Sequence, residues 1–192
     1  MSEQKAVKER TTWQRIARRI RVPLGFVFAA VFLWLARPTG HSILWSLLLV
    51  GPGVWLRGYA AGYVRKNAEL TTTGPYAHTR NPLYLGSMMI AFGFAAAAGS
   101  WIILILLAVL FAVIYLPTIK SEEEYLRVHF AGFDEYASRV PRLLPRLTPA
   151  PTDAASGRFS SALYRHHREY NCGMGAIAIY VALAVRLVYF IR

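Results

Sequence analysis

Apolar residues in this chain gather in long stretches and do not alternate with polar residues at a regular period. The stretches cover about residues 22–36, 42–64, 83–98, 101–118 and 173–191. Clustered apolar runs indicate helices in a bilayer, whose hydrocarbon core is ~30 Å thick and takes about 20 residues to cross. Because the third stretch holds only 16 residues, we expect flanking residues or local thinning of the bilayer to complete the shorter crossings.

The breaks and small residues between these stretches predict how the helices are arranged. Only Gly99-Ser100 separates the third stretch from the fourth, so we expect a tight antiparallel hairpin. Pro52 should kink the second helix, which a membrane helix tolerates when its neighbours satisfy the freed carbonyls. Gly58 and Gly62 are four residues apart and offer a face suited to close helix packing. The predicted fold class is an all-α integral membrane bundle with about five transmembrane helices.

The polar segments complete a single predicted domain over residues 1–192. Residues 1–21 are expected to form a basic amphipathic helix on the membrane surface. Apolar residues recur at helical spacing over 122–139 and predict an interfacial helix, after which four prolines exclude regular structure. The domain therefore divides into four parts: a basic helix (1–21), a four-helix membrane core (22–118), a polar segment (119–172) and a last membrane helix (173–191).

The positive charge of the chain predicts its orientation. The net charge is +12, and lysine and arginine are dense in residues 1–21, 65–80 and 120–168. Because these charges flank apolar segments, anionic lipid head groups explain them better than nucleic acid does. The positive-inside rule places the N-terminus and both long loops in the cytoplasm, at what we expect to be a bacterial inner membrane. Five crossings would leave the C-terminus outside, whereas Arg186 leaves a re-entrant last segment as an alternative.

Cysteine and histidine indicate no metal site. The single cysteine, Cys172, excludes an internal disulfide and any multi-cysteine metal site. The five histidines form no HExxH or similar pattern. We therefore expect no metal, and we assign Cys172 to simple packing.

Two polar motifs flank the predicted hairpin. Residues 74–86 read GPYAHTRNPLYLG, and residues 121–126, after the fourth apolar stretch, read SEEEYL. The hairpin should return the basic and the acidic motif to one membrane face. With the later FDEY and VPR, this ordered set over residues 57–142 resembles the isoprenylcysteine carboxyl methyltransferases of membranes, their bacterial relatives and the phospholipid N-methyltransferases. Asn81, where eukaryotic members commonly have histidine, is more similar to the bacterial branch.

The resemblance implies an S-adenosylmethionine-dependent methyltransferase, with S-adenosylhomocysteine as product and residues 119–172 as a cytoplasmic cofactor-binding segment. The implied acceptor is lipophilic and lies at the membrane interface, with the carboxylate of a prenylcysteine-like substrate as the leading expectation. Three alternatives stay open: a phospholipid or other lipid amine N-methyltransferase, an isoprenoid or sterol reductase, and a non-catalytic membrane scaffold. Membrane lipids are the expected partners, with no nucleic acid, and identification of the bound cofactor would separate the alternatives.

The motifs suggest roles for the charged residues. Arg80 can clamp the cofactor carboxylate with its planar fork, or it can simply be an interfacial arginine. Aligning the acidic motif on Leu126 selects Glu122 and Glu123, with Glu124 left as an alternative, to bind the ammonium and the ribose hydroxyls. These two can instead be acids at a helix start capped by Ser121.

The other site residues carry similar pairs of interpretations. Arg57 lies within the second helix and can hold a substrate carboxylate near the methyl group, or extend to the interface. We place Arg57 and Arg80 in the catalytic set, where alignment and desolvation are expected to do most of the work. The tyrosines of the two motifs can line the adenine or the sulfonium, or they can anchor the protein at the membrane interface. Gly86 can leave room for the cofactor, or it can allow close helix packing. The further predicted cofactor-binding residues are Tyr76, His78, Asn81, Pro82, Tyr84, Gly86 and Tyr125.

Overall fold

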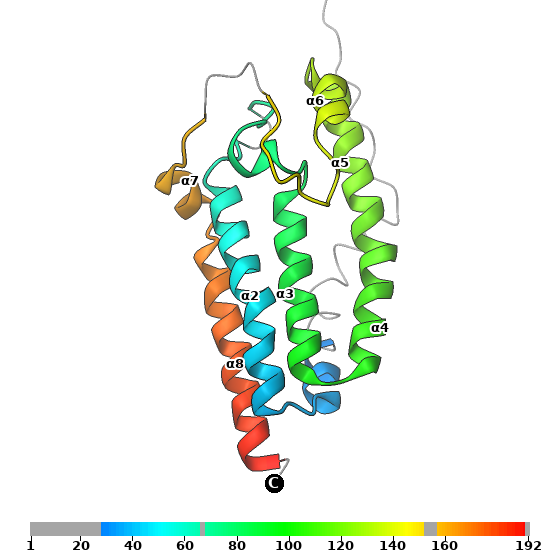
Figure 1. Cartoon of the computed structure of the whole chain (residues 1–192), viewed down its shortest axis with the longest axis vertical. Coiled ribbons are helices and arrows are strands. Elements are labelled where there is room, and N and C mark those ends of the chain that lie inside the picture. The colour runs from blue at the N-terminus through cyan, green and yellow to red at the C-terminus, as the bar shows by residue number, and fades with distance from the viewer. Residues whose placement is uncertain (1–27, 66–67, 152–156, 191–192) are drawn as a thin grey trace, which may run out of the picture.

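The protein is a bundle of long helices capped at one end by loops and short helices. The computed structural model describes residues 28–65, 68–151 and 157–190, and within these ranges it contains helices and loops but no strand. This confirms the all-α prediction. After a helix over residues 28–35, the long elements are α2 (Gly40–Ala61), α3 (Pro82–Ala98), α4 (Trp101–Leu110), α5 (Leu116–His129) and α8 (Tyr170–Phe190) (Figure 1). The short elements are a 3-10 turn (Gly74–Ala77), α6 (Phe133–Arg139) and α7 (Ser161–His166).

Three described helices are long and apolar enough to cross a membrane by length and composition. They are Gly40–Ala61, Trp101–His129 and Tyr170–Tyr189, and Pro82–Ala98 is a shorter apolar helix. The predicted count of five crossings stays a prediction, because the first apolar segment lies only partly within the described residues. The predicted basic helix over residues 1–21 lies outside them.

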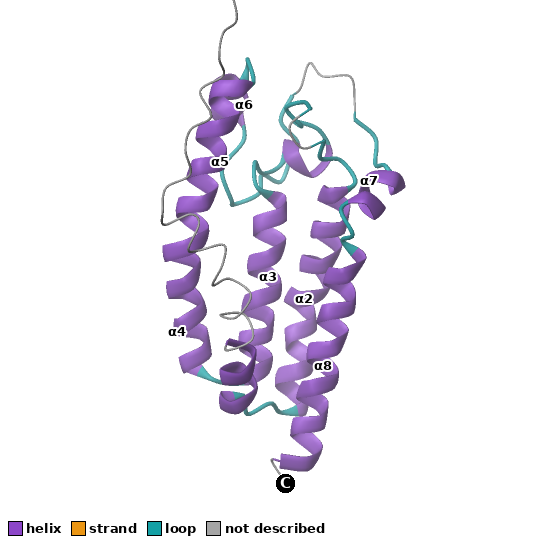
Figure 2. Ribbon diagram, turned by 180° about the vertical axis from the view of Figure 1, so that it is seen from behind, coloured by secondary structure: helices purple, strands orange, loops and turns teal. Residues whose placement is uncertain are grey.

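The hairpin predicted from Gly99-Ser100 is confirmed. Gly99 ends α3 with φ of 61°, a left-handed conformation that glycine adopts without strain, and α4 begins two residues later at Trp101. Figures 1 and 2 show the α3–α4 turn at one end of the bundle and the α2–α3 loop, α6 and α7 at the other. The two polar motifs therefore return to the same end.

The fourth helix is longer than its apolar stretch predicts. α4 passes through a π-helical turn (Phe111–Tyr115) straight into α5. Pro117 has no backbone N–H to donate and crowds the preceding turn, and the widened turn just before it is a form in which helices absorb such a defect. Because no helix begins at Ser121, the interpretation of Glu122 and Glu123 as capped first-turn acids is wrong.

The predicted interfacial helix over residues 122–139 is also wrong as a single element. α5 ends at His129, and α6 begins at Phe133. The break is set by Gly132, whose φ of 85° lies in the left-handed region that interrupts a right-handed helix. The chain therefore turns between α5 and α6, and residues 122–139 do not form one continuous helix.

Two glycines let α2 and α3 approach closely, and the sequence analysis selected one of them, Gly86. A Cβ on Gly53 would lie 2.9 Å from the Gly86 carbonyl oxygen, and a Cβ on Gly86 would lie 2.8 Å from the Gly53 carbonyl oxygen. Gly58 and Gly62 face Tyr164 and Phe159 instead. The close packing predicted for Gly58 and Gly62 therefore involves α7 and the segment that precedes it. Pro52 lies inside α2 without ending it.

Gly86→Ala is expected to lower the free energy of unfolding by about 1–3 kcal/mol, the usual cost of overpacking. The added methyl would meet backbone and the Arg57 Cγ, 2.7 Å away, so α2 and α3 would have to separate. Thermal unfolding in detergent measures the effect. Gly175→Ala in α8 is the matched control, because its Cβ would meet nothing within 4 Å. An unchanged melting temperature in Gly86→Ala would contradict the close approach.

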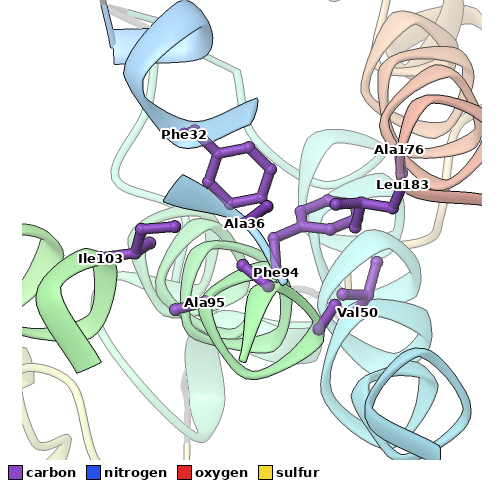
Figure 3. Close-up of a cluster of buried hydrophobic side chains, with 10 residues drawn as sticks. Phe32, Ala36, Val50, Phe94, Ala95, Ile103, Ala176 and Leu183 are labelled. Atoms are coloured by element: carbon purple, nitrogen blue, oxygen red, sulfur yellow. The ribbon is translucent and has the colours of Figure 1, made fainter. Parts of the chain in front are cut away.

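The apolar core ties the last helix to the rest of the bundle. Phe32, Val50, Phe94, Ile103 and Leu183 converge there from separate helices (Figure 3). Polar contacts add to this packing. Ser46 and Tyr180 share a hydrogen bond of 2.8 Å between α2 and α8, and Arg186 donates to the carbonyls of Trp34 and Ala36 at the end of the 28–35 helix. Arg186 therefore finds its acceptors on a neighbouring part of the protein while α8 stays a continuous helix, so its charge does not require the re-entrant alternative.

Candidate functional site

A buried carboxylate joins the basic and acidic motifs. Glu123 of α5 is 4% exposed. It accepts from Arg142 Nε at 3.0 Å and Nη2 at 2.8 Å, and from Asn81 Nδ2 at 3.3 Å. The hydrogen bonds to Glu123 raise the pKa of Arg142. One carboxylate thus holds together the start of α3, α5 and the loop after α6.

Arg80 is directed at acceptors of the protein itself. Its Nε lies 3.2 Å from Glu123 Oε1, within ion-pair range, and its Nη1 donates to the Ala137 carbonyl at 3.0 Å. The buried Nε nevertheless lacks a hydrogen bond of good geometry. Asn81 and Pro82 are both buried beside it, and Pro82 supplies the first residue of α3. Glu123 and the Ala137 carbonyl thus hold the guanidinium of Arg80 in place at the start of α3.

The turn at residues 76–79 binds the proline-rich loop that follows α6. His78 Nδ1 is 2.8 Å from the Arg146 carbonyl, and the Arg146 amide donates to the His78 carbonyl at 2.9 Å. Tyr136 donates its hydroxyl to the Tyr76 carbonyl at 2.8 Å. Burial raises the pKa of both Tyr76 and Tyr136, so both phenols stay neutral. In this structure His78 and Tyr76 therefore position the loop.

Aromatic side chains and the exposed Glu122 form a second group on the other side of Glu123. Tyr84 donates to Glu122 Oε1 at 2.9 Å and packs edge-on against Tyr115, with ring centroids 5.8 Å apart. Tyr115 stacks on Phe111 at 5.3 Å, and both belong to the π-helical turn. Such turns often occur at functional sites. Tyr125, three residues after Glu122 on α5, is half-exposed and stacks on His129, with ring centroids 3.9 Å apart.

Arg57 is held by acceptors of the protein itself near the end of α2. It donates to Glu169 from Nε at 3.1 Å and from Nη2 at 2.8 Å, a two-pronged pair that arginine forms well. Its Nη1 contacts Ser87 Oγ and the Leu83 carbonyl. Arg57 also occupies the space beside Gly86, so the room that we expected there for a cofactor is filled by helix packing and the arginine stem.

A hollow of about 480 Å³ lies near Arg57 and away from the predicted cofactor residues. None of the eleven residues that the sequence singled out lines it. Its lining comes from the end of α2, the start of α3 and the α7–α8 connection: Ala61, Arg65, Ala68, Leu83, Leu163, His166, His167 and Glu169.

The sequence analysis identified Glu123, Arg57 and Tyr84 but not the side chains that contact them. Arg142 was within the quoted VPR motif without a role. Ser87, Phe111 and Tyr115 lie in apolar stretches and carry no separate signal. Glu169 is 112 positions from Arg57, so only the folded chain brings them together. Within the described residues, no group of three or more histidine, cysteine, aspartate or glutamate side chains is placed to hold a metal ion.

Comparisons with known proteins cover most of the helical core. The family model described as phospholipid methyltransferase matches residues 24–132. The chain is 38% identical over 145 residues to the nickel-cobalt-cadmium resistance protein NccN of Alcaligenes xylosoxydans xylosoxydans, covering 68% of this chain and 67% of NccN. It is 35% identical over 137 residues to the cobalt-zinc-cadmium resistance protein CzcN of Cupriavidus metallidurans, covering 67% of this chain and 62% of CzcN, just under two thirds of that relative's length. No solved structure matches significantly.

Proposed function

This chain belongs to the phospholipid methyltransferase family of membrane methyltransferases, and from that premise we propose that it transfers a methyl group from S-adenosylmethionine to a lipophilic acceptor at the membrane interface. One observation carries the proposal. The family's basic and acidic motifs meet through Arg80, Asn81 and Glu123 at one end of an apolar helix bundle. We propose that this end faces the cytoplasm of a bacterial cell, with the bundle in the inner membrane.

The residues at this end fit the polar parts of the cofactor. The guanidinium of Arg80, whose side chain is 13% exposed, can donate to the cofactor carboxylate. Glu122 is exposed and can accept from the ammonium or the ribose hydroxyls, while Tyr84 and Tyr115 present ring faces that attract a sulfonium. The cofactor supplies the activated methyl group. The protein's contribution is to align and desolvate the attacking atom.

The preferred acceptor is the carboxylate of a prenylcysteine-like molecule, because a carboxylate is already a nucleophile at neutral pH. Arg57 is the arginine that would hold it, and the substrate carboxylate would take the place of Glu169, which occupies the fork with the same two-pronged geometry. The second candidate is a lipid amine. The aromatic rings around Glu122 favour a cationic head group, and Glu122 would then remove the amine proton.

Radiolabelled methyl transfer to a panel of lipophilic acceptors tests the proposal. The panel contains prenylcysteines, lipophilic thiols and amino lipids, each incubated with the purified full chain and labelled S-adenosylmethionine. We expect label in the prenylcysteine fraction and its loss in Arg57→Ala. Label in amino lipids alone would establish the second candidate. No transfer to any acceptor by folded protein that binds the cofactor would contradict the proposed reaction.

Arg80→Ala is expected to weaken S-adenosylmethionine binding by about 1.5–3 kcal/mol, the range for hydrogen bonds to charged groups. Arg80→Lys should recover little, because lysine lacks the planar fork. Calorimetry on detergent-solubilised protein measures both. Arg127→Lys is the matched control, since Arg127 is half-exposed on α5 and pairs with Asp134. Wild-type affinity in Arg80→Ala would leave Arg80 as a structural residue only.

A further inference from the structure

The hollow beside Arg57 is lined by residues from two parts of the chain, one inside the family match and one beyond it. Ala61, Arg65 and Leu83 belong to the region that the family model matches, which ends at residue 132. Leu163, His166, His167 and Glu169 lie beyond it. The hollow therefore exists because the C-terminal segment folds back over the end of α2, and it is separate from the Arg80–Glu123 cluster.

The backbone of the hollow's wall is strained. Arg168 has φ of 53°, the single non-glycine residue with positive φ among the described residues. Its two neighbours, His167 and Glu169, both line the hollow. A left-handed conformation is unfavourable for an arginine and persists only where the surroundings enforce it, and such outliers cluster at ligand-binding sites. The strained residue allows α7 and α8 to meet with both neighbours facing the same space.

The charge of the lining favours an anion. Glu169 is neutralised by its two-pronged pair with Arg57. Arg65 has only a 3.6 Å contact with Glu69, in which both side chains are more than half exposed, and a contact of this kind is weak. The first turn of the 21-residue α8 begins next to Glu169, so its partial positive charge adds to the arginine and imidazole donors.

The position of the hollow favours a lipid head group. It lies at the loop end of the membrane-length helices α2 and α8. Its apolar side consists of Ala61, Ala68, Leu83 and Leu163, and its polar side of Arg65, the two histidines and Glu169, whose charge Arg57 balances. A volume of about 480 Å³ suits a head group and the first carbons of its chains. We propose that this hollow binds the phosphate of an anionic membrane lipid, with Arg65 and His166 as its principal donors.

Native mass spectrometry of the full chain in detergent tests the proposal without relying on methyl transfer. Phosphatidylglycerol and phosphatidylcholine, matched in their acyl chains, are titrated separately, and soluble glycerol 3-phosphate is titrated as a third ligand. We expect phosphatidylglycerol to bind at least about fivefold more tightly than phosphatidylcholine. Arg65→Gln and His166→Gln should each weaken phosphatidylglycerol binding roughly fivefold, the effect of removing one basic group near a membrane surface. Both side chains are exposed, so these variants should fold.

Lys120→Gln is the matched control, because Lys120 is an exposed basic residue on α5 outside the hollow. It should leave the affinity for phosphatidylglycerol unchanged. If glycerol 3-phosphate binds as strongly as the lipid, the anion is a soluble phosphate ester. If it binds much more weakly, the anion is the lipid. Equal affinity for the two lipids, or wild-type affinity in both hollow variants, would overturn the proposal.

Discussion

Glu123→Ala is expected to lower the free energy of unfolding by about 3–5 kcal/mol, the cost of removing one partner from a buried ion pair. Glu123 is 4% exposed and is the shared acceptor of Arg142 and Asn81, with Arg80 at ion-pair distance. Its removal leaves Arg80, whose side chain is 13% exposed, without a counter-charge. Because the same cluster places the cofactor-binding residues, cofactor affinity should fall with stability.

Thermal unfolding in detergent, with and without S-adenosylhomocysteine, separates the two effects. Glu124→Ala is the matched control, because Glu124 is the exposed neighbour on α5 and should change the melting temperature little. The double variant Glu123→Ala with Arg142→Ala should be less destabilised than the sum of the single variants, since the two residues share one interaction. A melting temperature in Glu123→Ala equal to that of Glu124→Ala would contradict the central role of the carboxylate.

The length of the acceptor tail is expected to change turnover by several orders of magnitude. A tail transferred from water to hydrocarbon gains ~0.8 kcal/mol per buried methylene. A farnesyl-like acceptor should therefore be methylated far better than a short-chain analogue with the same head group. This follows from a site at the end of membrane helices, where the polar cofactor arrives from water and the tail remains in lipid.

Turnover of both acceptors at matched aqueous concentrations, in vesicles containing the protein, measures this dependence. The affinity for S-adenosylmethionine should not depend on the tail and serves as the internal control. Gly62→Leu should disturb the 157–164 segment and is therefore unsuitable as a block to long acceptors, because the new side chain would collide with Phe159. Equal turnover of short and long acceptors would favour a water-facing pocket.

The apolar stretches predicted the helices well because bilayer-length runs are a strong signal. The third stretch was placed within one residue of α3, and the Gly99 turn was identified from two residues. The fourth helix was predicted to end near residue 118, because the charged residues begin there, but it continues to His129. The backbone continues through Pro117 to His129 because a π-helical turn accommodates the proline.

The motifs predicted which segments meet, but not which atoms. Arg80, Asn81 and Glu123 were all identified, and the structure brings them together. That Glu123 is buried among them depends on Arg142, which arrives from a loop without regular structure. The Arg57–Glu169 pair is likewise a long-range contact, 112 positions apart. Charge pairing across such separations is decided by how the helices pack, and a single sequence holds little information about it.

The central claim is that the two motifs at the loop end of the bundle form one S-adenosylmethionine site. Calorimetric titration of S-adenosylhomocysteine into the folded, detergent-solubilised full chain tests it most directly. We expect a single saturable site in the wild-type protein, with affinity reduced by about 1.5–3 kcal/mol in Arg80→Ala and unchanged in Arg127→Lys. No binding of either S-adenosylhomocysteine or S-adenosylmethionine by protein that unfolds cooperatively would contradict the claim.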